Sequence, residues 1–529
     1  MDRNDYLVAP PAACDASVLA GLSARDILAA TVARTPAGLA YVDGPLRLTW
    51  GDAAACVAAL ADELERAGIG AGDVVGLRLP NGAAFAIAHL AIAELGAVTL
   101  PLHVPYGDAE VREFLAATSA RAYVHTGCTG DCRDLREAVP SLTVLVHCAT
   151  ERAAFSVEGT ASPARRRPAR IEPHAPFCIM PTSGTESPAP KLCLHTHDGL
   201  LSNARAFVAE AEIGPLDGLI VAGGFTHLFG LLGLHVSLIA GATLLALPRF
   251  DAHRFLALAA TEHATRAWAV PAQLIDLVEA ARTRPYRLTL REVRTAGAPA
   301  GAALIAGVRA ALGADVTVHW GMSELGGGIT TYGRDAGVHD AAIGLPIAGA
   351  EVRIARPDGS EAEPGEVGAL LYRRADLFRG YLNDPDATAR AFAPGGWLRT
   401  GDRASRDAAG VVHYHGREKD IINRGGYKIG SAEIEAHLQA LPAVRRAAVV
   451  AVPDPRLGER ACVVAELHPG ASLTLPEVAE LLASRGVAKY KWPEHLAIVE
   501  LMPMTATNKI AKSAVRELAR RLTTPAVTA

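Results

Sequence analysis

The sequence predicts an α/β protein with a large first domain and a smaller C-terminal one, and the first evidence is a regular alternation of two patterns. Apolar residues recur at helical spacing over residues 53–67 and 84–95, and short apolar runs follow at 74–79 and 98–102. This alternation is typical of parallel strands joined by crossover helices. We therefore expect helices over the first two ranges and strands over the other two.

Chain length and a change of pattern near residue 402 predict the second domain. A chain of 529 residues exceeds what one hydrophobic core usually serves. Beyond residue 402 we expect short strands and helices at 410–415, 433–439, 447–452, 462–466 and 475–485. We place the boundary near residues 417–419, which gives domains over 1–416 and 417–529; ~110 residues are enough for a separate domain.

Charge and composition exclude several classes of function. The net charge of −4 supplies no basic field, so no nucleic-acid partner is expected. Two long apolar stretches, residues 83–104 and 219–248, are interrupted by histidines and by glutamate or glycine. We therefore expect buried helices and strands there and no membrane span.

The cysteines and the first residues indicate a cytoplasmic protein. Eight cysteines are scattered along the chain, with neither a disulfide framework nor a second pair at zinc-ligand spacing. Residues 1–5 begin no secretory signal, because no apolar core follows a basic stretch. Free thiols in a reducing compartment are the expectation.

A strand expected at 177–180 runs into a loop rich in small hydroxyl residues. Residues 182–191 read Thr-Ser-Gly-Thr-Glu-Ser-Pro-Ala-Pro-Lys. Small hydroxyls and open backbone N–H groups can surround phosphate oxygens, and a lysine adds a positive charge. The loop lacks the P-loop spacing, so taken alone it fits a phosphate site and a plain turn equally.

Further motifs follow in order along the chain. They are Trp320-Gly321-Met322-Ser323-Glu324, Thr400-Gly401-Asp402, the run 416–428 (Gly-Arg-Glu-Lys-Asp-Ile-Ile-Asn-Arg-Gly-Gly-Tyr-Lys) and Lys509. An indole can stack on a base, a glutamate can hold Mg²⁺, and an aspartate can accept both hydroxyls of a diol. Each motif alone also fits a strand end, a turn or a surface lysine, but together they favour ATP-driven activation of a carboxylic acid.

The loop and the motifs together resemble those of the adenylate-forming superfamily, which includes acyl- and aryl-CoA synthetases, the adenylation domains of peptide synthetases and luciferases. The resemblance covers essentially the whole chain. It implies a large N-terminal domain of packed mixed sheets and helices and a small, mobile α+β C-terminal domain. It also implies an acid–thiol ligase, in which an acid and MgATP give acyl-AMP and pyrophosphate, and a thiol then takes the acyl group.

The resemblance implies nucleotide contacts from several segments. The residues expected to bind ATP are Thr182, Ser183, Gly184, Thr185, Lys191, Gly297, Ala298, Trp320, Gly321, Met322, Ser323, Asp402 and Arg417. Asp402 would accept the ribose hydroxyls, and the turn at Gly297 and Ala298 would pack along adenine.

Six residues are expected to serve the two half-reactions. Lys509 would neutralise charge developing between the carboxylate and the α-phosphate, Glu324 would hold Mg²⁺, and His227 would lie at the acid pocket, although an isolated histidine in an apolar stretch is often a core residue. Lys419 occupies the hinge position of relatives. After rotation of the small domain, Gly425 and Gly426 would line the tunnel for the thiol.

The chain also departs from the family pattern. Glu186 stands where threonine is usual, Ser187 where glycine is usual, one extra residue precedes Pro190 and Lys191, and Asn508 replaces a glycine. A carboxylate that faces ATP phosphates is repulsive. A catalytically impaired nucleotide-binding homologue is therefore the alternative function, and the oxidative chemistry of luciferases is a more distant one.

The substrate follows least directly from the sequence. The acid pocket is expected from residues 225–230, 296–299, 319–322 and 325–329, and the three glycines at 326–328 either widen one wall or loosen it. Similarity to aryl-activating relatives favours an aryl acid, with short or alicyclic acids left open, and Leu228 stands where many hydroxybenzoate-activating relatives have asparagine. The thiol is expected on CoA or on the phosphopantetheine of a carrier protein in trans, and a homodimer is a possible assembly.

Overall fold

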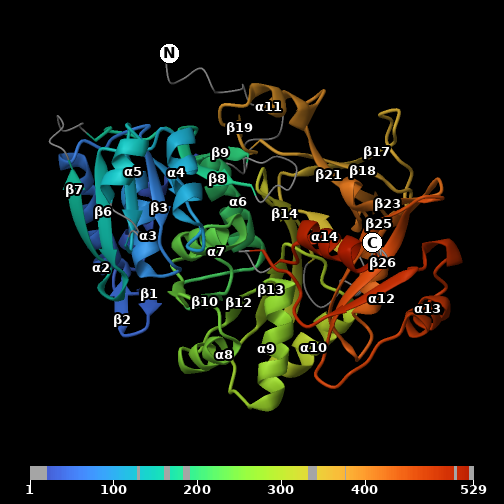
Figure 1. Cartoon of the computed structure of the whole chain (residues 1–529). Helices are drawn as coiled ribbons and strands as arrows, with labels where there is room; N and C mark the ends of the chain where they lie inside the picture. The colour runs from blue at the N-terminus through green and yellow to red at the C-terminus, as the bar shows by residue number, and fades with distance from the viewer. Residues whose placement is uncertain are drawn as a thin grey trace.

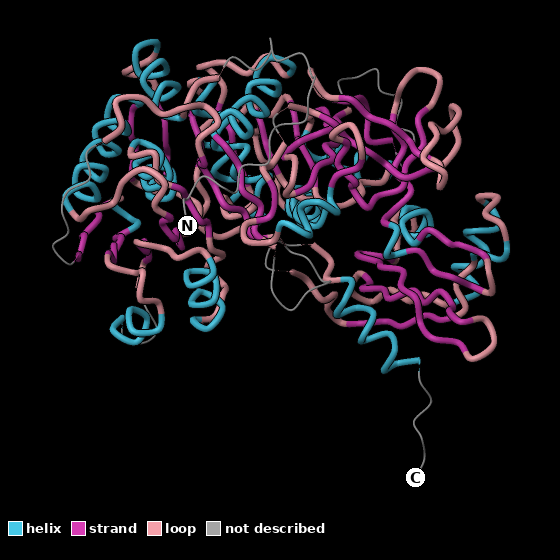
Figure 2. The backbone as a smooth tube through the Cα atoms, turned by 90° about the horizontal axis from the view of Figure 1, so that it is seen from above, coloured by secondary structure: helices cyan, strands magenta, loops and turns pink. Residues whose placement is uncertain are grey.

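The computed structural model describes residues 21–127, 132–159, 167–182, 191–331, 342–375, 377–505 and 509–523. The described chain forms three sheets with helices packed around them. The C-terminal strands and helices, drawn in orange to red, lie together at one end of the molecule (Figures 1 and 2). The predicted α/β fold with a large N-terminal and a small C-terminal part is confirmed.

One sheet is built mainly from parallel strands between residues 74 and 181. Its strands, in spatial order, are β19 (Gly380–Tyr381), β9 (Leu192–Thr196), β8 (Pro176–Pro181), β4 (Val98–Pro101), β3 (Val74–Arg78), β5 (Ala122–His125), β6 (Val144–Ala149) and β7 (Ala154–Gly159). The neighbours β8, β4, β3, β5 and β6 pair in parallel, as the alternating pattern predicts.

A second sheet has 14 strands among the described residues and changes direction part-way. Its strands, in spatial order, are β17 (Glu351–Ala355), β18 (Gly368–Arg373), β21 (Trp397–Arg406), β22 (Val412–Arg417), β16 (Ala342–Pro346), β15 (Gly326–Thr330), β14 (Asp315–Met322), β13 (Glu292–Ala296), β12 (Arg266–Trp268), β10 (Gly218–Val221), β11 (Thr243–Leu245), β1 (Leu39–Asp43) and β2 (Leu46–Thr49), with β20 (Phe392–Ala393) on β21. Strands β10 to β14 are parallel, whereas β14 to β16 are antiparallel. The change of direction places Trp320–Met322, the end of β14, beside β15.

The third sheet contains the C-terminal strands. They are β24 (Tyr427–Gly430), β23 (Ile421–Arg424), β26 (Gly458–Leu467) and β25 (Val444–Asp454), with β27 (His495–Val499) on β26. The sheet begins at Ile421, directly after the 3₁₀ turn Glu418–Asp420. A boundary near 417–419 stays our prediction for the two domains.

Helices cover the faces of the three sheets (Figure 1). They are α1 (Ala24–Arg34), α2 (Trp50–Arg66), α3 (Ala83–Glu94), α4 (Asp108–Ala117), α5 (Cys132–Ala138), α6 (His197–Glu210), α7 (Leu228–Ala240), α8 (Ala252–Thr261), α9 (Pro271–Thr283), α10 (Ala302–Leu312), α11 (Pro385–Ala391), α12 (Ser431–Leu438), α13 (Leu475–Ser484) and α14 (Lys512–Thr523). Helix α2 starts at a capping box in which Thr49 and Asp52 satisfy the first backbone N–H groups.

Helices α3 and α7 form the centre of the largest core. Every residue from Ala83 to Ala93 is buried, and α7 is buried along almost all of its length. A helix that is apolar on all sides needs such an environment, which explains the two long apolar stretches. Among the described residues, no helix combines the length and the hydrophobicity that a membrane span requires.

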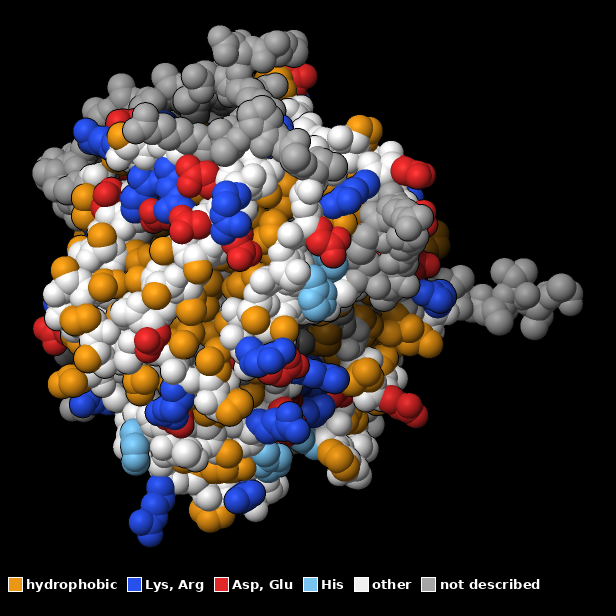
Figure 3. Space-filling view, turned by 90° about the vertical axis from the view of Figure 1, so that its left-hand side faces the viewer, with side chains coloured by type: hydrophobic (Ala, Val, Ile, Leu, Met, Phe, Trp, Pro, Cys, Tyr) orange, Lys and Arg blue, Asp and Glu red, His pale blue; other side chains and the backbone are white. Residues whose placement is uncertain are grey.

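The surface does not collect charge of one sign on the face seen in Figure 3. There, Lys and Arg side chains lie beside Asp and Glu side chains, with hydrophobic atoms scattered between them. This agrees with the small net charge of −4.

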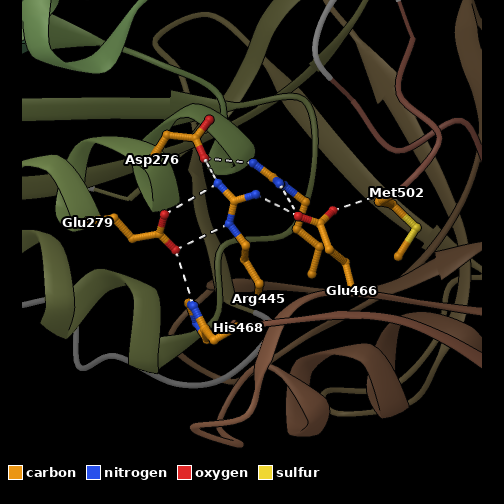
Figure 4. A network of polar contacts seen from close by, with 7 residues as sticks. Asp276, Glu279, Arg445, Glu466, His468 and Met502 are labelled. Atoms are coloured by element: carbon orange, nitrogen blue, oxygen red, sulfur yellow. Dashed lines mark hydrogen bonds and ion pairs between the residues drawn. The ribbon is translucent and has the colours of Figure 1, made fainter. Parts of the chain in front are cut away.

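Ion pairs join the C-terminal sheet to helix α9 of the larger part (Figure 4). Arg445 and Arg446 on β25 each bind Oδ1 of Asp276, at 2.8 and 2.7 Å, and Arg445 also reaches Glu279 at 3.3 Å. Glu466 on β26 holds both arginines at 2.6 and 2.8 Å. We call these five residues the clasp, because they fix the small part against the large one in the orientation seen here.

Candidate active site

Lys509 lies inside the large part of the molecule, next to His227 and Gly297. Its Nζ is 3.4 Å from Nε2 of His227. Gly297 has φ +89°, and a Cβ built there would lie 2.5 Å from Cε of Lys509. Glycine is therefore needed at 297 both for its left-handed backbone and for the approach of the lysine. Lys509 and His227, which are predicted to be catalytic, and Gly297, which is predicted to contact adenine, are therefore neighbours in space.

His227 is held as a neutral ring. It is the N-cap of α7, and its Nδ1 accepts a hydrogen bond from the backbone N–H of Phe229 at 3.3 Å. Burial, and then the charges of Lys509 and His103, hold the pKa of His227 well below its ordinary value. Since Nδ1 accepts, the proton of the neutral ring is at Nε2, the atom that faces Lys509.

Lys509 is charged near neutral pH but unusually acidic for a lysine. Burial, and then the positive charge of Arg417, lowers its pKa to about 8. Its ammonium and the Nε2–H of His227 are both donors. Two donors that converge in one place leave room for a common acceptor, such as a carboxylate or phosphate oxygen.

Asp402 is positioned by Trp320, which lies on β14. Oδ2 of Asp402 accepts a hydrogen bond from the indole N–H of Trp320 at 2.8 Å, and Oδ1 lies 3.2 Å from Nε of Arg417. Asp402 is 3% exposed, whereas the Arg417 side chain is 44% exposed. Burial raises the pKa of Asp402 against the opposing effects of Arg417 and Trp320. One hydrogen bond and one ion pair therefore join Trp320, Asp402 and Arg417, three of the residues predicted to contact the nucleotide.

Glu324 is oriented by a tyrosine that sequence reasoning missed. The Tyr381 hydroxyl donates to Oε1 of Glu324 at 2.7 Å, and Nζ of Lys191 lies 4.9 Å from the centre of the Tyr381 ring. The backbone of Ser323 is fixed as well, because its carbonyl bonds Nε2 of His195 at 2.7 Å. The pair β19–β9 brings Tyr381 beside the strand that leads out of the Lys191 loop.

This environment fits one Mg²⁺ ion held together with phosphates. Mg²⁺ is usually bound by one or two carboxylates plus substrate phosphates, and Glu324 is a buried carboxylate whose partner Tyr381 lies against Lys191. Within the described ranges, no three or more His, Cys, Asp or Glu side chains are grouped as an all-protein metal site.

The remaining predicted residues have definite places. Gly425 and Gly426, with φ +56° and +90°, form the two-residue turn of the β23–β24 hairpin, where positive φ at both positions requires glycine. Lys419 lies in the 3₁₀ turn between the second and third sheets. Thr182 donates its backbone N–H to the Lys191 carbonyl at 2.8 Å, which closes the base of the phosphate loop. Ser183, Gly184 and Thr185 lie outside the described residues, as do Glu186, Ser187 and Asn508.

The three glycines at 326–328 neither widen nor loosen the pocket wall. A Cβ at Gly327 would lie 2.1 Å from the His319 ring, and one at Gly326 would lie 2.8 Å from the Asn203 side chain. Asn203 binds the backbone of Gly327 on both sides, donating to its carbonyl at 2.6 Å and accepting from its N–H at 3.0 Å. The glycines therefore allow tight packing of β15 against α6.

Comparisons with known proteins identify the family of this chain. A family model described as AMP-binding enzyme matches residues 28–382, and a model of the AMP-binding enzyme C-terminal domain matches residues 433–509. The chain belongs to the AMP-binding enzyme family.

The relatives in this family include enzymes that act on aromatic acids. The chain is 33% identical to pyochelin synthase PchD of Pseudomonas aeruginosa, over 94% of this chain and 92% of that protein. It is also 33% identical to a Streptomyces protein named salicylyl-CoA synthase / salicylate adenylyltransferase, over 91% of each. The structure of ATP-bound MatB from Rhodopseudomonas palustris superposes with a TM-score of 0.83 at 26% identity, covering 95% of this chain and all of that one.

The predicted superfamily and the predicted enzyme class are confirmed by these matches. An ATP-bound relative of the same fold also supports the use of ATP. The roles of individual residues stay proposals.

Proposed function

We propose that the protein activates a small carboxylic acid, preferably an aryl acid, to an acyl-AMP and then forms a thioester. The observation that carries this proposal is the convergence of Lys509 and His227 beside Gly297, next to the group formed by Trp320, Asp402 and Arg417. It places two donors for a reacting oxygen close to residues suited to hold a nucleotide.

In the first half-reaction, a carboxylate oxygen of the acid bonds to the α-phosphorus of ATP, and the bond to the pyrophosphate oxygen breaks. The Lys509 ammonium stabilises the negative charge that spreads over the carboxylate and α-phosphate oxygens. His227 donates its Nε2–H to the same region and keeps the acid oriented. Both groups act by position and charge, and neither needs to transfer a proton.

Other residues around the site hold the nucleotide. Asp402 accepts the two ribose hydroxyls, and Arg417 balances its charge. Gly297 and Ala298 are exposed and carry little side-chain bulk, so adenine can lie against them and against the edge of Trp320. Lys191 and the small hydroxyl residues of its loop bind phosphate oxygens. Glu324 would hold Mg²⁺, which when bound would supply positive charge beside the phosphates.

In the second half-reaction, a thiol sulfur attacks the acyl carbon, AMP leaves, and the thiol proton passes to solvent. The clasp and the buried Lys509 belong to the orientation that serves the first step. We propose that the small domain turns about Lys419 and that the hairpin with Gly425 and Gly426 then lines the path of the thiol.

The acid and the acceptor are proposed from the relatives' names. A relative named for salicylate supports an aryl acid. The same name includes a CoA synthase activity, whereas the pyochelin synthase is named only for its product. CoA and a carrier phosphopantetheine both remain candidate acceptors, and a cytoplasmic location and a homodimer stay predictions.

Acid-dependent exchange of labelled pyrophosphate into ATP tests the proposal. We expect exchange with benzoic or hydroxybenzoic acids and much less with straight-chain acids, followed by thioester formation when CoA or a carrier protein is added. Tight ATP binding without exchange for any acid class would contradict the proposal and establish the impaired homologue instead.

A further inference from the structure

The turn that leads into His227 begins at the carboxyl end of β10. Residues 222–226 read Ala-Gly-Gly-Phe-Thr, and two adjacent glycines give the backbone unusual conformational freedom. The backbone N–H of His227 donates to the Gly224 carbonyl at 2.9 Å. A bond across so short a segment does not fix the glycines ahead of it, so the direction of the His227 ring depends on contacts from other elements.

Asn81 binds this turn on both sides from a distant part of the chain. Its Nδ2 donates to the Gly223 carbonyl at 2.8 Å, and its Oδ1 accepts a hydrogen bond from the backbone N–H of Phe225 at 2.7 Å. A primary amide carries both donors and an acceptor, so one side chain can satisfy both backbone groups. The two bonds tie the residues on either side of Gly224 to one point.

Asn81 itself is held in place. It lies between β3 and α3, and Gly82 is the N-cap residue of this buried helix. The backbone N–H of Ala83 donates to Oδ2 of Asp43 on β1 at 3.0 Å. A Cβ at Gly82 would lie 2.5 Å from the same oxygen, so the chain passes close to Asp43. The start of α3 is therefore anchored, and Asn81 with it.

A second side chain of the same sheet contacts the turn. Nδ1 of His103, which follows β4, lies 2.6 Å from the Thr226 hydroxyl oxygen. Burial lowers the pKa of His103 to about 4, so its ring is neutral at neutral pH and can form this hydrogen bond in either tautomer. Strands β3 and β4 are parallel neighbours, so Asn81 and His103 follow the same edge of the sheet. The turn is therefore held from that edge by two side chains.

The turn is packed directly against the first residues of α7. A Cβ at Gly230 would lie 2.2 Å from the carbonyl oxygen of Gly224. His227 is the N-cap of this helix and lies between these two glycines in the chain. A shift of the turn therefore reaches the His227 backbone, and the ring moves with it.

We propose that Asn81 is a positioning residue for adenylation, which fixes the turn ahead of His227 and thereby the direction of the His227 Nε2–H. The inference rests on the proposed function and adds a residue that acts through His227. Nε2 of His227 lies 3.4 Å from Nζ of Lys509, so both donors reach one oxygen only within a narrow range of ring orientations. A misplacement of about 1 Å at such a site can cost about 100-fold in rate.

Two variants of Asn81 and one control test the inference by pyrophosphate exchange. Asn81→Ala loses both bonds to the turn. Asn81→Asp keeps the volume of the side chain and the acceptor for Phe225 but loses the donor to Gly223. Thr31→Val is the matched control, because it removes a buried bond of 2.8 Å to the Leu238 carbonyl near the opposite end of α7.

We expect Asn81→Ala to lower kcat/KM for the acid by about 10- to 100-fold and Asn81→Asp by a smaller factor, while KM for ATP changes little. Thr31→Val should keep the wild-type value. In a His227→Ala background, adding Asn81→Ala should cost about twofold or less, since its effect passes through His227. The same loss with and without His227, or wild-type kinetics in both Asn81 variants, would overturn the inference and leave adenylation established.

A measurement without substrate separates this inference from a failure of the proposed function. In protein labelled with ¹⁵N-histidine, His227→Ala identifies the ring signals of His227, which in the wild type should report a neutral ring with its proton on Nε2. Asn81→Ala and Asn81→Asp should shift or broaden these signals, and Thr31→Val should not. Unchanged signals in both Asn81 variants would overturn the inference. Exchange with no acid, together with shifted signals, would overturn the proposed function and leave Asn81 as the residue that orients His227.

Discussion

The ionisation of Lys509 links a single residue to the pH dependence of the reaction. Its pKa of about 8 in the folded protein lies below the ordinary lysine value of 10.5, so the ammonium is lost at a lower pH than usual. Only the charged form stabilises the carboxylate and phosphate oxygens. Activity is therefore expected to be complete well below pH 8 and to decline above it.

We predict that kcat/KM for adenylation falls above about pH 8, approaching a tenfold loss per pH unit. A pH series of pyrophosphate exchange measures this directly. Lys509→Arg keeps its charge over the whole range, so its residual activity should show no such decline. A wild-type profile that stays level to pH 10, or the same decline in Lys509→Arg, would exclude Lys509 as the titrating group.

Trp320 has a role that its motif alone does not reveal. A strand end with a bulky aromatic residue suggested stacking on adenine, but the indole N–H also holds Oδ2 of Asp402. This bond fixes the carboxylate, so if Asp402 accepts the ribose hydroxyls as we propose, less free energy is needed to order it on binding.

We predict that Trp320→Phe raises KM for ATP by about tenfold, the effect of losing one hydrogen bond to a buried carboxylate, with a smaller change in kcat. Steady-state kinetics with ATP varied at saturating acid measures it. Tyr372→Phe is the control, because it alters the ring 6.1 Å from Trp320 and leaves the bond to Asp402 in place. An unchanged KM in Trp320→Phe would show that Asp402 does not need this bond.

At the scale of elements, helix α9 and strands β25 and β26 carry the clasp. Arg445 and Arg446 both bind the carboxylate of Asp276 on α9. Loss of this charge therefore weakens the contact between the two parts. The Asp276 and Glu279 side chains are 29% and 34% exposed, so salt should weaken their ion pairs as well.

We predict that Asp276→Asn lowers the rate of pyrophosphate exchange by about fivefold, as expected when a contact worth ~1 kcal/mol that favours one orientation is lost. Thioester formation from supplied acyl-AMP should be unchanged or faster. Glu366→Gln, which breaks the surface pair with Arg356, should alter neither step. Equal losses in both half-reactions would mean that the clasp only supports folding.

The spacing of apolar residues predicts many of the helices and strands, because it shows which face of a segment is buried. The helix expected at 84–95 is α3 (Ala83–Glu94), and the strand expected at 462–466 lies within β26. Tyr381 and Asn203 could not be assigned a role from the sequence, since each acts across more than 50 residues of chain, Tyr381 on Glu324 and Asn203 on Gly327. The sequence likewise does not show whether a run of glycines leaves open space or allows close packing. At residues 326–328 the glycines allow close packing.

At the scale of the whole molecule, the residues of the proposed site come from two parts that, in the proposed mechanism, move apart. His227, Gly297 and Asp402 belong to the larger part, whereas Lys509 arrives from the C-terminal one. The proposed site is complete for adenylation only when the two parts are docked. A second orientation can then expose the acyl-AMP to a thiol without a second active site.

The most direct test of this account is to measure both half-reactions in Lys509→Ala, with Lys489→Ala, which changes an exposed lysine, as the control. We predict that pyrophosphate exchange falls by about 10²- to 10³-fold, the usual effect of removing one group that stabilises transition-state charge. Thioester formation from supplied acyl-AMP should remain close to the wild-type rate. Equal loss of both steps in folded Lys509→Ala would contradict the central claim that one site serves the two reactions in two orientations.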